Sequence, residues 1–143
     1  MEKLFNREIA ALDDVFGFID GFIEQFSLDA DTAFATRLVV EELFTNLVKH
    51  NQTSGERILI RLARDPSCLT IMLKDFDVDP FDASQAEPVD IRAPLDRRRI
   101  GHLGIHIVKG LVDTLTYQYT KEERTLCVTA VKNLEAKDVR HQT

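Results

Sequence analysis

The chain has 143 residues, of which 44% are hydrophobic, and its formal net charge is −6. This length and apolar content fit one domain with a single core. The negative charge repels nucleic acid and anionic lipid, which argues against direct nucleic-acid or membrane binding. Charged residues interrupt every apolar stretch before the roughly 20 residues that a membrane span needs, and residues 1–7 lack the apolar core of a signal peptide. We therefore expect a cytoplasmic protein.

The first part of the chain predicts one strand and two helices. Residues 3–10 indicate a short strand, and residues 11–28 have the apolar spacing of an amphipathic helix. A longer helix carries apolar residues from Phe34 to Val48 and ends before a stretch rich in helix breakers. Asp29 or Asp31 is placed to cap the start of this second helix.

Two β-hairpins are predicted from runs of apolar or alternating residues. Residues 56–64 and 68–75 form the first, joined by an Asp-Pro-Ser turn. Residues 114–120 and 124–132 form the second. This pattern indicates antiparallel strand pairs.

Between the hairpins, residues 76–99 contain three prolines and show no periodicity, which is typical of a functional loop. A third helix is expected over residues 102–113. We expect one domain over residues 1–134 and a polar C-terminal tail over residues 135–143. The order of elements predicts an antiparallel or mixed sheet with helices on one face.

The second helix carries a polar stripe beside its apolar face. Glu42, Asn46 and His50 are spaced by four residues and therefore project together at the border of the apolar arc. One interpretation is a solvated helix edge with local hydrogen bonds. The other is a functional site, because a partly desolvated carboxylate can serve as a general base and an amide oxygen can bind a hard cation such as Mg²⁺.

Three further features have both a structural and a functional interpretation. Gly101 and Gly104 flank a helix start, where backbone amides can bind phosphate, although such glycines also simply form turns. Asp75 ends a strand, where it can accept a hydrogen bond from a purine amine or open a turn. The Arg97–Arg99 run is either solvated or has one arginine that contacts phosphate or a protein partner.

The order of these motifs resembles the GHKL ATPases, which share the Bergerat nucleotide-binding fold. The matching series is Glu42-x-x-x-Asn46, Asp75 at a strand end, a variable loop, and Gly101-His-Leu-Gly104. The segments VVEELFTNLVKHN, DPFD and PLDRRRIGHLGIHIVKGLVDTLTYQY are similar to the RsbW-type anti-sigma factor serine/threonine kinases. The resemblance implies an α+β two-layer sandwich with a mixed, mostly antiparallel sheet and helices on one face.

The resemblance also implies a role for each site residue. Glu42 would be the catalytic base that acts on a serine hydroxyl, and Asn46 would coordinate Mg²⁺ on the triphosphate of ATP. Asp75 would bind the adenine amine. Gly101, Gly104 and Arg99 would complete the nucleotide site. Catalysis would come mainly from positioning and charge neutralisation.

One departure from the family pattern lies next to Asp75. Relatives read Asp-x-Gly, whereas this chain places Asp77 at the glycine position. We expect this replacement to remove access to positive φ and to reduce nucleotide affinity or rearrange the loop.

Two main functions follow from the resemblance. The first is an ATP-dependent kinase that binds a sigma factor and phosphorylates a STAS-domain anti-sigma factor antagonist, as a homodimer in the cytoplasm. The second is a nucleotide-binding regulatory module that sequesters a protein partner with weak or no phosphotransfer. A sensor histidine kinase fragment ranks below both, because no dimerising helix pair or phosphoacceptor histidine region fits within the chain.

Overall fold

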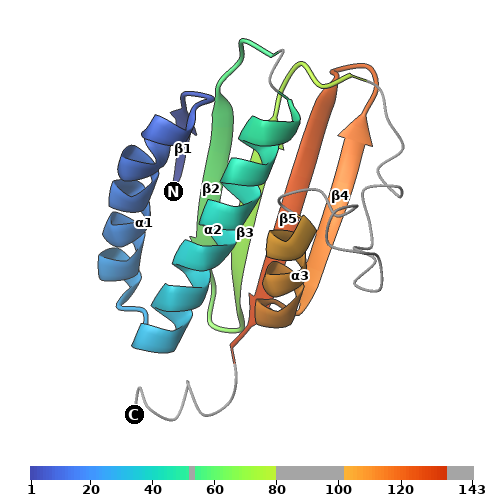
Figure 1. Ribbon diagram of the computed structural model, residues 1–143. Helices are drawn as coiled ribbons and strands as arrows, with labels where there is room; N and C mark the ends of the chain where they lie inside the picture. The colour runs from blue at the N-terminus through green and yellow to red at the C-terminus, as the bar shows by residue number, and fades with distance from the viewer. Residues whose placement is uncertain (52–53, 80–101, 135–143) are drawn as a thin grey trace.

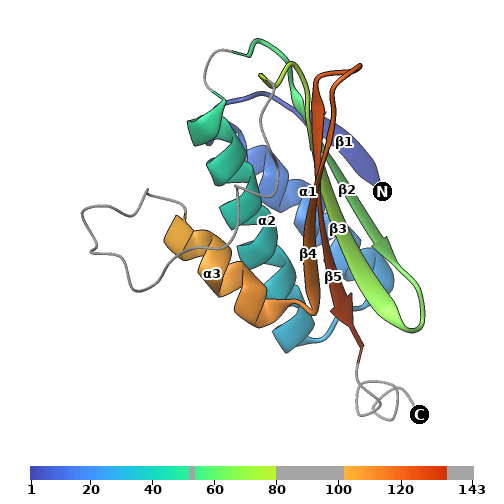
Figure 2. The ribbon, with the colours of Figure 1, turned by 90° about the vertical axis from the view of Figure 1, so that its right-hand side faces the viewer.

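The computed structural model describes residues 1–51, 54–79 and 102–134, and in the last segment it describes side chains from His106 onward. The chain forms two layers, a β-sheet and a layer of helices that covers one face of it (Figure 1, Figure 2). The strands are β1 (Glu2–Phe5), β2 (Ile58–Arg64), β3 (Cys68–Asp75), β4 (Thr114–Thr120) and β5 (Thr125–Asn133). The helices are η1 (Ile9–Ala11, a 3-10 helix), α1 (Leu12–Phe26), α2 (Ala30–His50) and α3 (His102–Leu111). The predicted α+β two-layer sandwich is confirmed.

The strands lie in the order β1-β2-β3-β5-β4, and every described pair of neighbours is antiparallel. Alternate residues of β2 and β3 are buried, which explains the period of two in both sequences. β3 and β4 have the predicted bounds, whereas β2 begins at Ile58 instead of 56 and β5 at Thr125 instead of 124. Both predicted hairpins are therefore confirmed.

The first strand is shorter than the sequence predicts. β1 ends at Phe5 and η1 follows, so the prediction of a strand over residues 3–10 is wrong beyond Phe5. Phe5 pairs with Ile58, the first residue of β2, and the ladder has no further partner residue on β2 beyond this pair. The chain therefore leaves the sheet and carries Arg7 toward the end of β3.

The central helix, α2, begins with a side-chain cap. Of the two candidate caps, Asp29 is the one used, and its carboxylate accepts a hydrogen bond from the Thr32 amide at 2.7 Å. Asp31 lies in the first turn and Lys49 in the last, where their charges complement the helix dipole. Its fully buried apolar side chains include Val39, Val40, Leu43 and Phe44. Each contributes about 1.5–3 kcal/mol by leaving water.

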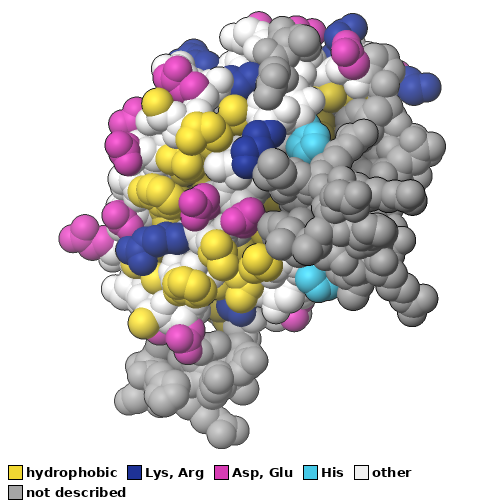
Figure 3. All heavy atoms as spheres, in the orientation of Figure 1, with side chains coloured by type: hydrophobic (Ala, Val, Ile, Leu, Met, Phe, Trp, Pro, Cys, Tyr) yellow, Lys and Arg dark blue, Asp and Glu magenta, His cyan; other side chains and the backbone are white. Residues whose placement is uncertain are grey.

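The outer surface of α1 and α2 mixes hydrophobic with acidic and basic side chains (Figure 3). Phe34 is the most exposed large apolar side chain in the described part of the chain. Within the described residues, none of the helices combines the length and hydropathy needed to cross a bilayer.

Candidate functional site

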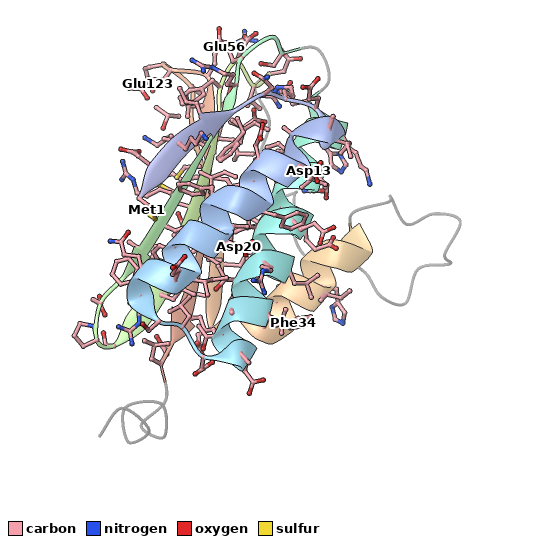
Figure 4. All side chains as sticks on the ribbon, turned by 90° about the vertical axis from the view of Figure 1, so that its left-hand side faces the viewer. Met1, Asp13, Asp20, Phe34, Glu56 and Glu123 are labelled. Atoms are coloured by element: carbon pink, nitrogen blue, oxygen red, sulfur yellow. The ribbon has the colours of Figure 1, made fainter. Side chains whose placement is uncertain are left out.

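Several segments that are distant in sequence meet at one end of the sheet. α2 ends there at His50, and β3 ends there at Asp75 (Figure 1). Glu56, just before β2, and Glu123, in the turn between β4 and β5, lie at this same end (Figure 4). The end of α2 and the end of β3 therefore lie in a common region.

Asp75 continues the buried face of β3. Leu69, Ile71 and Leu73 are buried, and Asp75 follows in the same phase with only 1% of its surface exposed. Burial raises the pKa of its carboxyl above the ordinary value of 3.8, because the charged form loses its contact with water. An apolar strand therefore delivers one carboxylate to the edge of the core.

Both carboxylate oxygens of Asp75 have partners. Arg7 forms an ion pair with Oδ1 through its Nη2, and the Asn51 side chain donates to Oδ2 at 3.3 Å. The hydrogen bond and charge of Arg7, and then the Asn51 hydrogen bond, lower the pKa of Asp75 against the larger effect of burial. Neither partner could be predicted from the sequence. Arg7 lies 68 residues from Asp75, and no local pattern distinguishes it from a surface arginine.

The guanidinium of Arg7 also binds two backbone carbonyls. Its Nε donates to the carbonyl of Glu56 at 3.1 Å, and its Nη1 donates to that of Leu47 at 3.4 Å. Leu47 follows Asn46 on α2. Arg7 therefore connects the helix that carries Asn46 with the strand that ends at Asp75.

The loop after β3 is attached to the end of β4 and to the turn between β4 and β5. The Val78 amide donates to the Arg124 carbonyl at 2.8 Å, and the Tyr119 hydroxyl donates to the Val78 carbonyl at 2.7 Å. The Arg124 guanidinium also pairs with Asp79 at 2.9 Å and with Asp77 at 3.3 Å. These ion pairs are exposed and contribute little. The two bonds to the Val78 backbone are therefore the main attachment.

Asp77 has a φ of 56°, in the left-handed region that glycine usually occupies. Aspartate is one of the few other residues that enter this region. The expectation that Asp77 removes access to positive φ is therefore wrong. Its effect on nucleotide affinity stays a prediction.

This backbone conformation predicts the effect of two substitutions. Asp77→Val should lower the free energy of unfolding by about 1–2 kcal/mol, because a β-branched residue is disfavoured at positive φ. Asp77→Gly should leave it nearly unchanged. Asp79→Val is the matched control, since it removes the shorter ion pair with Arg124 at a position without positive φ. Equal stability of the two valine variants in urea denaturation would contradict this explanation.

Glu42 and Asn46 lie one turn apart on α2, and both are half-buried. Oδ1 of Asn46 is buried and has no hydrogen-bond partner among the described residues. A buried acceptor without a partner is costly, and a role in binding a ligand or ion is one explanation for such an atom. A neutral amide oxygen suits a hard cation such as Mg²⁺. No group of three or more His, Cys, Asp or Glu side chains in the described segments could hold a metal by itself.

The remaining predicted site residues are described only in part. Gly101 and Arg99 lie outside the described residues. α3 begins at His102, as predicted, and Gly104 lies in its first turn. The helix ends at Leu111 instead of the predicted 113.

The sequence profile of the histidine kinase-like ATPase domain family matches residues 5–132. None of the curated proteins searched matches the chain. Among solved structures, a chain of the SiaB–SiaC complex from Pseudomonas aeruginosa is similar in fold, with a TM-score of 0.67. The match covers 92% of this chain and 88% of that chain at 11% sequence identity. Because the family match spans most of its length, the chain belongs to the histidine kinase-like ATPase domain family.

Proposed function

We propose that the chain is an ATP- and Mg²⁺-dependent serine/threonine protein kinase of the RsbW type. It binds a sigma factor and phosphorylates a STAS-domain antagonist. The observation that carries this proposal is the arrangement on α2, where a half-buried carboxylate, Glu42, lies one turn from the buried oxygen of Asn46, which has no hydrogen-bond partner among the described residues. Membership of an ATPase domain family supports ATP as the phosphate donor.

In the proposed reaction, Glu42 accepts the proton of a serine or threonine hydroxyl on the partner protein. The hydroxyl oxygen bonds to the γ-phosphorus while the bond to the departing ADP oxygen breaks. Asn46 would hold Mg²⁺, which neutralises phosphate charge when it is bound. Asp75 would accept a hydrogen bond from the adenine amine. The other proposed nucleotide contacts are Gly101, Gly104 and Arg99.

The proposed partners are proteins. The structurally similar chain comes from a complex of two proteins, SiaB and SiaC, which supports a protein partner for this chain as well. We propose that this partner belongs to the antagonist class. We further propose that residues 1–134 act as one domain in the cytoplasm and that the active form is a homodimer.

A second function has one observation in its favour. The Arg7–Asp75 ion pair occupies the carboxylate that would bind adenine. A regulatory module that sequesters a protein partner, with weak or no phosphotransfer, would tolerate this pair more readily than a fast kinase would.

Calorimetric titration with ATP, with and without Mg²⁺, followed by γ-phosphate transfer to candidate STAS-domain proteins, separates these functions. The kinase predicts Mg²⁺-dependent binding and transfer to one serine or threonine. Tight ATP binding without transfer to any cognate partner would favour the regulatory module. Failure to bind ATP at millimolar concentration would exclude both the kinase and the nucleotide-binding regulatory module.

Asn46→Ala provides a separate prediction. We expect the variant to lose the Mg²⁺ dependence of ATP binding, at a cost of about tenfold or more in affinity. Its thermal stability should not fall, because the substitution removes a buried acceptor that has no partner among the described residues. The matched control is Thr45→Ala, which changes the neighbouring residue on the same helix. A destabilised Asn46→Ala with unchanged Mg²⁺ dependence would assign Asn46 a structural role.

A further inference from the structure

The guanidinium of Arg7 is held in place from three directions. It contacts the carbonyl of Leu47 near the end of α2, the carbonyl of Glu56 before β2, and the carboxylate of Asp75 at the end of β3. The Arg7 side chain is only 6% exposed. This arginine is therefore an internal component of the candidate site.

The contacts of Arg7 limit what else Asp75 can bind. Oδ1 is paired with Arg7, Oδ2 accepts from Asn51, and the Asp75 side chain is 2% exposed. A carboxylate has lone pairs for further donors, but a donor must also reach it. At this degree of burial, a base amine can approach only if one of the present partners moves.

We propose that Arg7 is a specificity-determining residue of the nucleotide site, because it occupies the Asp75 carboxylate and so removes the preference for a 6-amino purine. This inference rests on the proposed placement of the adenine base beside Asp75, and in the wild-type chain it replaces the proposed amine hydrogen bond to Asp75 with the Arg7 contact. With Arg7 in place, the base contributes little discrimination, and the phosphate contacts carry most of the affinity for a nucleoside triphosphate.

The relative strength of the competing donors supports this assignment. The guanidinium of Arg7 offers a charge-assisted hydrogen bond to a buried carboxylate, whereas the adenine amine is neutral. Displacing Arg7 would also leave its charge without the Asp75 partner, because arginine cannot lose its proton in a protein. The amine therefore competes poorly for Oδ1.

Comparison of ATP with purine riboside triphosphate, which lacks the 6-amine, tests the inference. In the wild-type chain with Mg²⁺, we expect similar dissociation constants for the two nucleotides. In Arg7→Gln, which is neutral and shorter, we expect ATP to bind at least about tenfold more tightly than the deamino analogue. Arg37→Gln is the matched control, since Arg37 forms an exposed ion pair with Asp20 on the outer helical surface.

Each outcome bears on one proposal. A wild-type preference for ATP of about tenfold or more would overturn the role of Arg7, and this result does not depend on a variant that folds. Similar binding of both nucleotides by folded Arg7→Gln would overturn it as well. Arg7→Lys is a second variant, which retains the charge and should keep the wild-type lack of preference. Binding of neither nucleotide to any of these proteins would instead remove the proposed ATP-dependent function, and the assignment of Arg7 with it.

Discussion

Glu42→Ala is expected to lower the rate of phosphate transfer to a STAS-domain partner by about 10²–10⁴-fold, the usual contribution of a general base. Nucleotide affinity should be unchanged, because the proposed role of Glu42 concerns the partner's hydroxyl and not ATP. The measurement is single-turnover transfer of labelled γ-phosphate, together with calorimetric titration of ATP.

Two further variants separate chemistry from structure. Glu41→Ala is the matched control, because Glu41 is also half-buried but projects about 100° away around α2. It should retain transfer. Glu42→Gln keeps the shape of the side chain and should be as inactive as Glu42→Ala. Transfer at the wild-type rate by Glu42→Ala would remove the base assignment, and loss of ATP binding by Glu42→Gln would point to a structural effect.

The second large effect is expected at Asp75. Asp75→Ala leaves the buried guanidinium of Arg7 without its counter-charge and should reduce the free energy of unfolding by about 3–5 kcal/mol. The melting temperature should fall by roughly 10 °C. Arg61→Ala is the matched control, because its ion pair with Glu2 is half-exposed and contributes at most about 1 kcal/mol. Equal destabilisation by the two substitutions would show that the Arg7–Asp75 pair is not a buried pair in solution.

Arg7→Met replaces the other partner of the ion pair. Its loss of stability should depend on pH, whereas that of Asp75→Ala should not fall in acid. Burial already raises the pKa of Asp75, and loss of Arg7 removes the two largest opposing effects, so the pKa rises further. When the pKa of a carboxyl is higher in the folded state than the unfolded value of 3.8, the protonated carboxyl stabilises the fold. This stabilisation is complete below pH 3.8 and is lost as the pH rises through the folded-state pKa.

The free energy of unfolding of Arg7→Met should therefore fall below that of the wild type by less near pH 5 than near pH 7, as measured by urea denaturation at both pH values. Lowering the pH should not reduce the loss of stability in Asp75→Ala, because Arg7 stays charged throughout this pH range. A deficit of Arg7→Met that does not change with pH would contradict the assignment of its cause to the Asp75 carboxylate.

Elements with a strong local pattern could be predicted from the sequence. The alternation in residues 68–75 predicts the observed bounds of β3, and the breakers after Val48 place the end of α2 within a few residues. The end of β1 could not be predicted in this way. It is set by where β2 begins, at Ile58, and that is a property of the strand pairing and not of residues 3–10.

In the candidate site too, residues on a periodic helix or strand could be predicted, whereas partners joined by tertiary contacts could not. The positions of Asn46 and Asp75 follow from helical and strand periods. The buried oxygen of Asn46, which has no hydrogen-bond partner in the part of the chain that the structure describes, is compatible with the predicted metal ligand. Arg7 and Asn51 join Asp75 only through tertiary contacts, across 68 and 24 residues respectively. The positive φ of Asp77 does not follow from the family pattern of Asp-x-Gly, because aspartate enters the left-handed region as well as glycine.

The attachment of the loop after β3 to the β4–β5 turn has a consequence for evolution. Both backbone groups of Val78 are bonded to residues more than 40 positions downstream, Tyr119 and Arg124. A change in the length or conformation of that turn would shift the loop that begins at Asp75. The two segments should therefore have co-varied during descent, so that homologues with a different β4–β5 turn also carry a different sequence between Asp75 and Asp79.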